Sequence, residues 1–163
     1  MAKDTEPVAL MLLECPSGYL FLRRAAHKSS PGKWSPPGGH IERESDISAA
    51  IRELREEAGV VVGDAASVGM FLLGKFRVHL FHKKLDSDPE VKVSDEHSAY
   101  AFVSRSEMAI HAAGIPASRG SDSGRKPQML SDYTAVGQHI VTKYLISQNA
   151  PFANAVKMTV KIP

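Results

Sequence analysis

The sequence lacks several features that define specialised classes of protein. A single cysteine, Cys15, excludes an intramolecular disulfide framework and any metal site built from several cysteines. It precedes Pro16 at the end of an apolar run, where we expect a partly buried structural thiol. No hydrophobic run is long enough to cross a membrane, and the acidic residues near the N-terminus fit no signal peptide. These absences predict a cytoplasmic protein without a membrane partner.

The sequence also has little net charge. It holds 20 Lys and Arg against 18 Asp and Glu, a formal charge of +2, and the basic residues are scattered. This composition does not predict a basic surface for nucleic acid. A phosphate-bearing ligand would therefore have to be bound by a few local cations. With 163 residues and 43% hydrophobic content, the chain is expected to form one domain, residues 1–163.

The hydrophobic pattern predicts strands around separated helices. Apolar runs at 8–14 and 19–24 flank the turn-rich CPSG and predict a hairpin. Residues 25–46, rich in Pro, Gly and Ser, predict a long irregular loop. Ser45 or Asp46 as N-cap and Gly59 as terminator bound a predicted helix of about three and a half turns.

The second half continues this alternation. We expect two or three strands within 60–85, short strands at 91–93 and 99–104, a short helix capped by Ser104 or Ser106, and a long helix opened by Ser131. The loop at 112–130 is low in apolar residues, and the tail after Pro151 could add a strand or a homodimer contact. The order of elements predicts an α/β or α+β sandwich with a mixed β-sheet between helical layers.

The stretch RELREEAGV places Glu53, Glu56 and Glu57 within an arc of roughly 100° on the predicted helix. Beside them lies a separate apolar stripe that would pack on the core. A solvated acidic face is one interpretation, because like charges on an exposed helix cost only a few tenths of a kcal/mol per pair. Carboxylates in a cleft would instead favour a hard divalent cation, Mg²⁺ or Mn²⁺ in its place, and hence phosphate chemistry.

The spacing around these glutamates decides between the two interpretations. Residues 38–60 satisfy G-x5-E-x7-R-E-U-x-E-E-x-G-U, where U is aliphatic, a match expected by chance on the order of once in a billion starting positions. The fixed positions are Gly38, Glu44, Arg52, Glu53, Leu54, Glu56, Glu57, Gly59 and Val60. With the approach FLRRAAHKSSPGKWSPPGGHIE, this region resembles the Nudix, or MutT-like, hydrolases, and 38–60 is identified as a Nudix box.

The resemblance implies an αβα sandwich and Mg²⁺-dependent hydrolysis of a nucleoside diphosphate linked to another group. It implies that Glu53, Glu56 and Glu57 bind metal or help activate water, and that Arg52 orients a carboxylate of its own helix. Arg52 and Glu56 are four residues apart, which suits such a pair. It also implies a metal-binding backbone carbonyl at Gly38 or Gly39. The loop before Glu44 is one residue shorter than the family pattern, so both glycines stay candidates.

Further candidates lie outside the box. Glu96 is similar in position to an additional catalytic glutamate of the family, with a solvated loop acid as the equal alternative, and for the adjacent His97 we favour solvent exposure. Arg24, Glu44 and Trp34 are candidates for substrate binding. Arg23 and Arg24 point in opposite directions at a strand end, and Arg24 better matches the family arginine. For Trp34 a core anchor is the favoured alternative to stacking on a base.

The sequence therefore predicts a Mg²⁺-dependent pyrophosphohydrolase with a small nucleotide as substrate. Our first hypothesis is a nucleoside triphosphate, oxidised or not, cleaved to monophosphate and pyrophosphate. A nucleotide sugar or a dinucleoside polyphosphate is an alternative. A non-hydrolytic nucleotide-binding module is a rival from another class, although this chain keeps every box carboxylate. An isomerase of the same fold is a weaker rival, because Cys15 lies on the first hairpin.

Overall fold

The structure is a computed structural model that describes residues 4–115, 125–146 and, for the backbone alone, 156–159. The loop at 112–130 is thus described only in part. Of the tail after Pro151, only a strand at 156–159 is described, so the expected homodimer contact lies outside the described residues. No helix in these ranges is both long and apolar enough to cross a membrane.

The described residues form an eight-stranded mixed sheet with the order β3-β2-β1-β6-β5-β8, to which β4 adds on β1 and β7 on β2. The central pair β1 and β6 is parallel, and every other pairing is antiparallel. The strands are β1 Glu6–Cys15, β2 Gly18–Arg24, β3 Trp34–Ser35, β4 Gly38–His40, β5 Asp64–Leu73, β6 Phe76–Lys84, β7 His97–Val103 and β8 Val156–Thr159.

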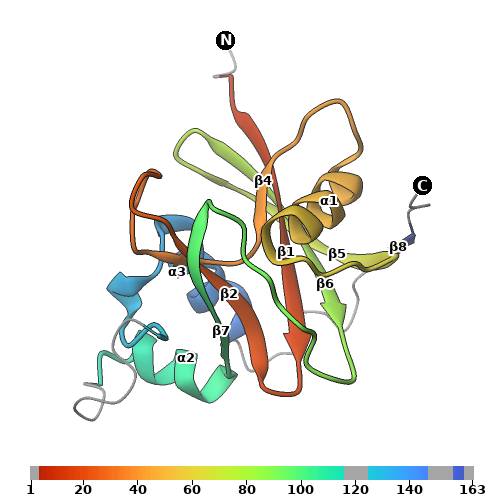
Figure 1. Cartoon of the computed structure of the whole chain (residues 1–163). Coiled ribbons are helices and arrows are strands. Elements are labelled where there is room, and N and C mark those ends of the chain that lie inside the picture. Colours follow the sequence, from red (N-terminus) through yellow and green to blue (C-terminus); the bar gives the residue numbers. More distant parts are fainter. Residues whose placement is uncertain (1–3, 116–124, 147–155, 160–163) are drawn as a thin grey trace.

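Helices cover both faces of this sheet (Figure 1). Side chains alternate along β1, so Ala9, Met11 and Leu13 pack with helix α1, Asp46–Ala58, in one core. Leu10 and Leu12 point the other way, into a second core. That second core is completed by helix α2 Arg105–Ala112, the short 3-10 helix η1 Leu130–Asp132, helix α3 Ala135–Ile140 and the π-helical turn η2 Val141–Leu145. The predicted α+β sandwich is confirmed.

Several predicted elements agree with the structure. The first hairpin, the helix at 46–58 with Ser45 as N-cap and Gly59 in the left-handed conformation, and the helix capped by Ser104 are all confirmed. Cys15 is buried, as expected. The predicted strand at 91–93 is wrong, because these residues run as an extended loop along the end of α1.

The long helix expected from Ser131 is also wrong at its start. The segment first pairs with β3: Tyr133 bridges Trp34, and the Thr134 N–H donates to the Trp34 carbonyl at 2.9 Å. Thr134 then acts as N-cap, its Oγ1 accepting from the Gly137 N–H at 2.9 Å. The loop after β2, expected to be irregular, likewise contains β3 and β4, and β4 places Gly38 and Gly39 against β1. Both differences arise from tertiary pairing that local sequence does not encode.

Candidate functional site

Helix α1 supplies the acidic groups of the site. Its apolar residues Ile47, Ile51 and Leu54 are buried against the sheet, which leaves the adjacent face toward β4. The Ser45 hydroxyl accepts from the Ser48 N–H at the first turn, and the Gly59 N–H closes the last turn on the Arg55 carbonyl. The helix is therefore fixed at both ends, and its carboxylates have a defined direction.

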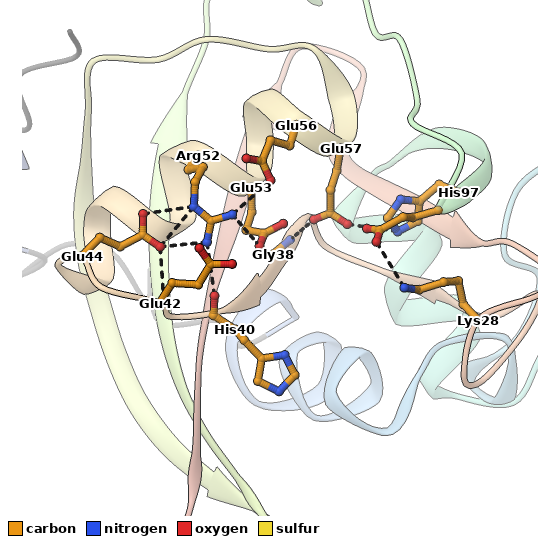
Figure 2. Close-up of polar contacts among 11 residues, drawn as sticks. Lys28, Gly38, His40, Glu42, Glu44, Arg52, Glu53, Glu56, Glu57 and His97 are labelled. Carbon is orange, nitrogen blue, oxygen red and sulfur yellow. Dashed lines mark hydrogen bonds and ion pairs between the residues drawn. The ribbon is translucent and has the colours of Figure 1, made fainter.

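Arg52 lies at the centre of the acidic face and holds three carboxylates (Figure 2). Its Nε is 3.1 and 3.0 Å from the two oxygens of Glu44, and its Nη2 is 2.8 Å from Glu44 Oε1. Its Nη1 donates to Glu53 Oε1 and to Glu56 Oε2, each at 3.0 Å. The expected pairing of Arg52 with Glu56 is present, and Arg52 lowers the pKa of Glu44 by hydrogen bonding.

The three glutamates of the helix face different surroundings. Glu57 is 5% exposed, and its Oε1 accepts from the Gly38 N–H at 2.8 Å. Burial raises the pKa of Glu57 to about 8, and nearby Glu53 and Glu96 add to the effect. Burial also raises the pKa of Glu53, whereas the Glu56 side chain is 52% exposed. A cation entering beside Glu53 and Glu57 would relieve this unfavourable burial of negative charge.

The glycine pair on β4 lets the strand lie against the helix. A Cβ on Gly39 would come within 2.5 Å of Glu53 Oε1. A Cβ on Gly38 would come within 2.4 Å of the Ala9 carbonyl oxygen and would overlap Leu10. A side chain at Gly38 would therefore clash with the backbone of β1, and a side chain at Gly39 would displace the Glu53 carboxylate.

The loop before β7 is bound to the C-terminal turn of α1. The Ser94 N–H donates to the Glu57 carbonyl at 3.1 Å, and the Ala25 N–H donates to the Glu96 carbonyl at 2.9 Å. These bonds place the Glu96 side chain in the same cavity as Glu53 and Glu57, with its Oε1 3.2 Å from Lys28 Nζ. Glu96 thus lines the candidate site.

His97 corrects one expectation from the sequence. Its ring is buried, with the residue 8% exposed, and Nε2 lies 3.3 Å from Glu57 Oε2. Burial lowers the pKa of His97 to about 4. Simple alternation along β7 could not place this ring: Ala101 and Val103 face the second core, whereas the register shift opposite Arg23 and Arg24 lets His97 reach Glu57 on α1. The solvated interpretation of His97 is wrong.

These groups line one cavity of about 620 Å³. Its acidic wall carries Glu53, Glu57 and Glu96, and a basic wall carries Arg24, His27 and Lys28. An apolar wall is made by Val8, Leu10, Phe76 and Val136. A volume of this size suits a small organic ligand. Lys28, His27 and the apolar wall were not identified from the sequence, because the strands and loops that bring them together are distant along the chain.

The candidate substrate-binding residues divide between the cavity and other places. Arg24 lines the cavity, and its guanidinium donates to Ser29. Arg23 turns away and bonds the Gly32 carbonyl. Trp34 is 2% exposed in the second core and does not line the cavity, which favours the core anchor over stacking on a base. Glu44 is held by Arg52 and does not line the cavity, and its contact with substrate stays a prediction.

The donor set fits a hard divalent cation. Glu53, Glu57 and Glu96 present only oxygen, the ligand that Mg²⁺ and Mn²⁺ prefer. Within residues 4–115 and 125–146, no three His, Cys, Asp or Glu side chains are already gathered closely enough to hold an ion. Arg52 and the Gly38 amide instead hold the carboxylates. Binding a cation would require Glu53 and Glu57 to replace part of these hydrogen bonds by contacts with the ion.

Comparison with known proteins gives a family and several relatives. The NUDIX domain model matches residues 4–120. The bis(5'-nucleosyl)-tetraphosphatase [asymmetrical] of Sus scrofa is 34% identical over 84 residues, which cover 45% of this chain and 57% of that enzyme. The m7GpppN-mRNA hydrolase NUDT17 of Danio rerio is 42% identical over 55 residues, covering 32% of this chain and 18% of the relative. The chain thus spans little more than half the length of the first of these relatives, and less of the second.

Solved structures agree on the fold. The MutT protein from Methanosarcina mazei superposes with a TM-score of 0.56 at 28% identity, covering 66% of this chain and 83% of that one. The NUDIX hydrolase from Nitrosomonas europaea gives a TM-score of 0.67 at 20% identity and covers 91% of this chain and 74% of that one. At 20% identity, the second similarity shows the fold alone. Because it covers 91% of this chain, the agreement in fold is not limited to the region of α1.

Proposed function

Because the chain belongs to the NUDIX domain family, we propose that it hydrolyses a phosphoanhydride bond in a nucleoside diphosphate derivative. The observation that carries the proposal is the cavity shared by Glu53, Glu57 and Glu96 on one wall and by Arg24 and Lys28 on another. Anionic phosphates need cations, and an acidic wall faces phosphate only with a metal ion between them. The two walls together therefore favour a metal-bound polyphosphate.

We propose that Glu53, Glu56 and Glu57 hold Mg²⁺, with Mn²⁺ as a substitute. When bound, such an ion polarises phosphoryl oxygens, stabilises the leaving group and lowers the pKa of coordinated water. Arg52 would steady Glu53 and Glu56 through its two Nη1 contacts of 3.0 Å.

The alternation of β4 favours Gly38 over Gly39 as the residue whose carbonyl faces the metal. Backbone groups of Pro37 and Ile41 bond β1 through Met11 and Pro7, so the odd-numbered residues face β1. Gly38 lies between them, and its N–H points instead to Glu57. In extended backbone the N–H and C=O of one residue point the same way, which directs the Gly38 carbonyl toward the helix.

The remaining residues would bind and orient the substrate. Arg24, His27 and Lys28 would contact the phosphates, and the apolar wall of Val8, Leu10, Phe76 and Val136 would receive the nucleoside. Water attacks one phosphorus, the bridging P–O bond breaks, and the water proton passes to a base. Glu96 is our candidate base, because its carboxylate lines the cavity and its side chain is 46% exposed.

We retain a nucleoside triphosphate as first candidate substrate, with monophosphate and pyrophosphate as products. A dinucleoside polyphosphate is the second candidate, favoured by the similarity to the Sus scrofa tetraphosphatase. Chromatography of the products from both classes, with nucleotide sugars included, distinguishes them. Release of a nucleoside triphosphate from a dinucleoside tetraphosphate at the higher kcat/KM would select the second candidate.

The test of the activity compares Glu57→Gln with Glu90→Gln, an exposed glutamate with the same change of charge. We expect Glu57→Gln to lower kcat by at least about 100-fold, because an electrostatic group at the reacting centre is lost. Glu90→Gln should retain activity. Turnover that is equal in both variants, or tight nucleotide binding without product in the wild type, would contradict the assignment.

Three further expectations stay predictions of the sequence. They are the cytoplasmic location, the single domain over 1–163 and a homodimer contact after Pro151. Gel filtration and fractionation of cells that express the chain would test them directly.

A further inference from the structure

We propose that His97 is the positioning residue for Glu57, an inference that rests on the proposed function. The ring Nε2 of His97 lies 3.3 Å from Glu57 Oε2, while the Gly38 N–H holds Glu57 Oε1 at 2.8 Å. Each oxygen of the most buried glutamate of the site therefore has its own neighbour. Together the two neighbours set the direction of the carboxylate (Figure 2).

Because His97 is buried, its ring nitrogens need hydrogen-bond partners within the protein. The residue is 8% exposed, and its Nδ1 is a buried atom that lacks a hydrogen-bond partner among the described residues. Glu57 is thus the polar side chain that His97 contacts in the described part of the chain. A buried ring that served packing alone would be more favourable as an apolar side chain, because its nitrogens would then not be desolvated.

The position of His97 is fixed from outside the site. Its N–H bonds the Ser94 carbonyl at 3.1 Å, and Ser94 in turn donates to the Glu57 carbonyl at 3.1 Å. From there β7 pairs with β2 along its length. Through Ser94, the backbone of His97 is therefore linked to the backbone of Glu57. This link holds the imidazole at a fixed distance from the Glu57 carboxylate.

A neutral donor suits this place better than a cation. The ring is buried and lines the same cavity as Arg24 and Lys28, which already supply positive charge there. Uncharged imidazole carries one N–H, which at Nε2 can donate to the carboxylate. A lysine or arginine here would cancel the charge of Glu57. Histidine orients the carboxylate and leaves that charge for a divalent ion.

The experiment compares three variants of His97 in the full chain. His97→Gln offers an amide N–H close to the place of Nε2, His97→Asn offers one near Nδ1, out of reach of Glu57, and His97→Leu offers none. The measurements are the Mn²⁺ dissociation constant, by titration calorimetry without nucleotide, and kcat and KM with Mg²⁺. We expect Leu and Asn to weaken Mn²⁺ binding and lower kcat by about 10- to 100-fold, with the Gln variant close to wild type.

His111 is the matched control, because it is also 8% exposed but bonds Tyr133 outside the cavity. His111→Leu should lower thermal stability and leave Mn²⁺ binding unchanged. If all three His97 variants bind Mn²⁺ within twofold of wild type while Glu57→Gln loses binding, the positioning role is wrong and the proposed function stands. If Glu57→Gln also binds and turns over normally, the proposed function itself fails.

Discussion

Single residues divide the acidic face of α1 into parts with separate tasks. Arg52 holds Glu44, Glu53 and Glu56, whereas Glu57 is held by Gly38 and contacted by His97. The carboxylates are therefore held by two separate sets of partners. Replacing Arg52 by lysine would not reproduce the arrangement, because an ammonium lacks the planar fork that reaches three groups.

The two glycines of β4 allow a sharp prediction at this scale. In Gly39→Ala the new Cβ would lie 2.5 Å from Glu53 Oε1, so the carboxylate must move. We expect kcat to fall by about 10- to 100-fold, since displacement by about 1 Å at a reacting centre can have that effect. Steady-state kinetics measures this, and urea unfolding should show a much smaller effect.

Gly38→Ala and Gly63→Ala are the comparisons. The Gly38 Cβ would press on backbone atoms of β1, so we expect a loss of about 1–3 kcal/mol in the free energy of unfolding. Gly63 has open space around its Cβ position, and its substitution should change neither quantity. Equal activity in Gly39→Ala and Gly63→Ala would show that Glu53 needs no fixed position.

At the scale of elements, α1 is tied to the sheet by polar contacts as well as by its apolar stripe. His79 on β6 lies between Asp46 in the first turn of α1 and Ser67 on β5. Its Nδ1 is 2.9 Å from Asp46 Oδ2, and its Nε2 is 2.7 Å from Ser67 Oγ. This connection joins the beginning of the helix to two neighbouring strands, while the 92–97 loop holds its end.

We expect His79→Leu to lower the free energy of unfolding by about 1–3 kcal/mol, because Asp46 and Ser67 both lose a partner. Ser67→Ala removes one contact and should lower it by about 0.5–1.5 kcal/mol. Urea unfolding at pH 7 compares the two. A His79→Leu variant as stable as wild type would mean that the apolar stripe alone fixes the helix.

At the scale of the whole molecule, the sheet carries two cores of different character. The core under α1 is made of aliphatic side chains together with Met11, Cys15 and Phe81. The opposite core contains Tyr133, whose hydroxyl lies 2.7 Å from His111 Nδ1. Desolvation by burial lowers the pKa of His111 below its ordinary value of 6.5, so the folded protein keeps this ring neutral.

This burial predicts a loss of stability in acid. The unfolded chain takes up a proton at His111 near pH 6.5, and the folded chain does so only at lower pH, so protons favour unfolding below pH 6.5. The contribution is complete above pH 6.5 and disappears as the pH falls. We expect the stability difference between wild type and His111→Gln to shrink between pH 7.5 and 5. Denaturant unfolding across this range measures it, and a difference independent of pH would contradict the prediction.

The sequence by itself determined the elements whose signals are local. The first hairpin, the capped helix at 46–58 and the Nudix box follow from alternation, caps and fixed spacing, and the family model confirms the recognition. The box also predicted that Arg52 and the three helix glutamates lie together, because neighbours on successive helix turns are close in any fold.

Tertiary structure alone decided the rest. It buried Trp34, turned Glu44 to Arg52 and moved the start of the last helix to Ala135. It also brought His97 to Glu57 across 40 positions of sequence and placed Lys28 beside Glu96. These contacts depend on which strands pair and which face of each strand turns inward. Pairing between distant segments is set by the packing of the whole chain and leaves no local pattern to read.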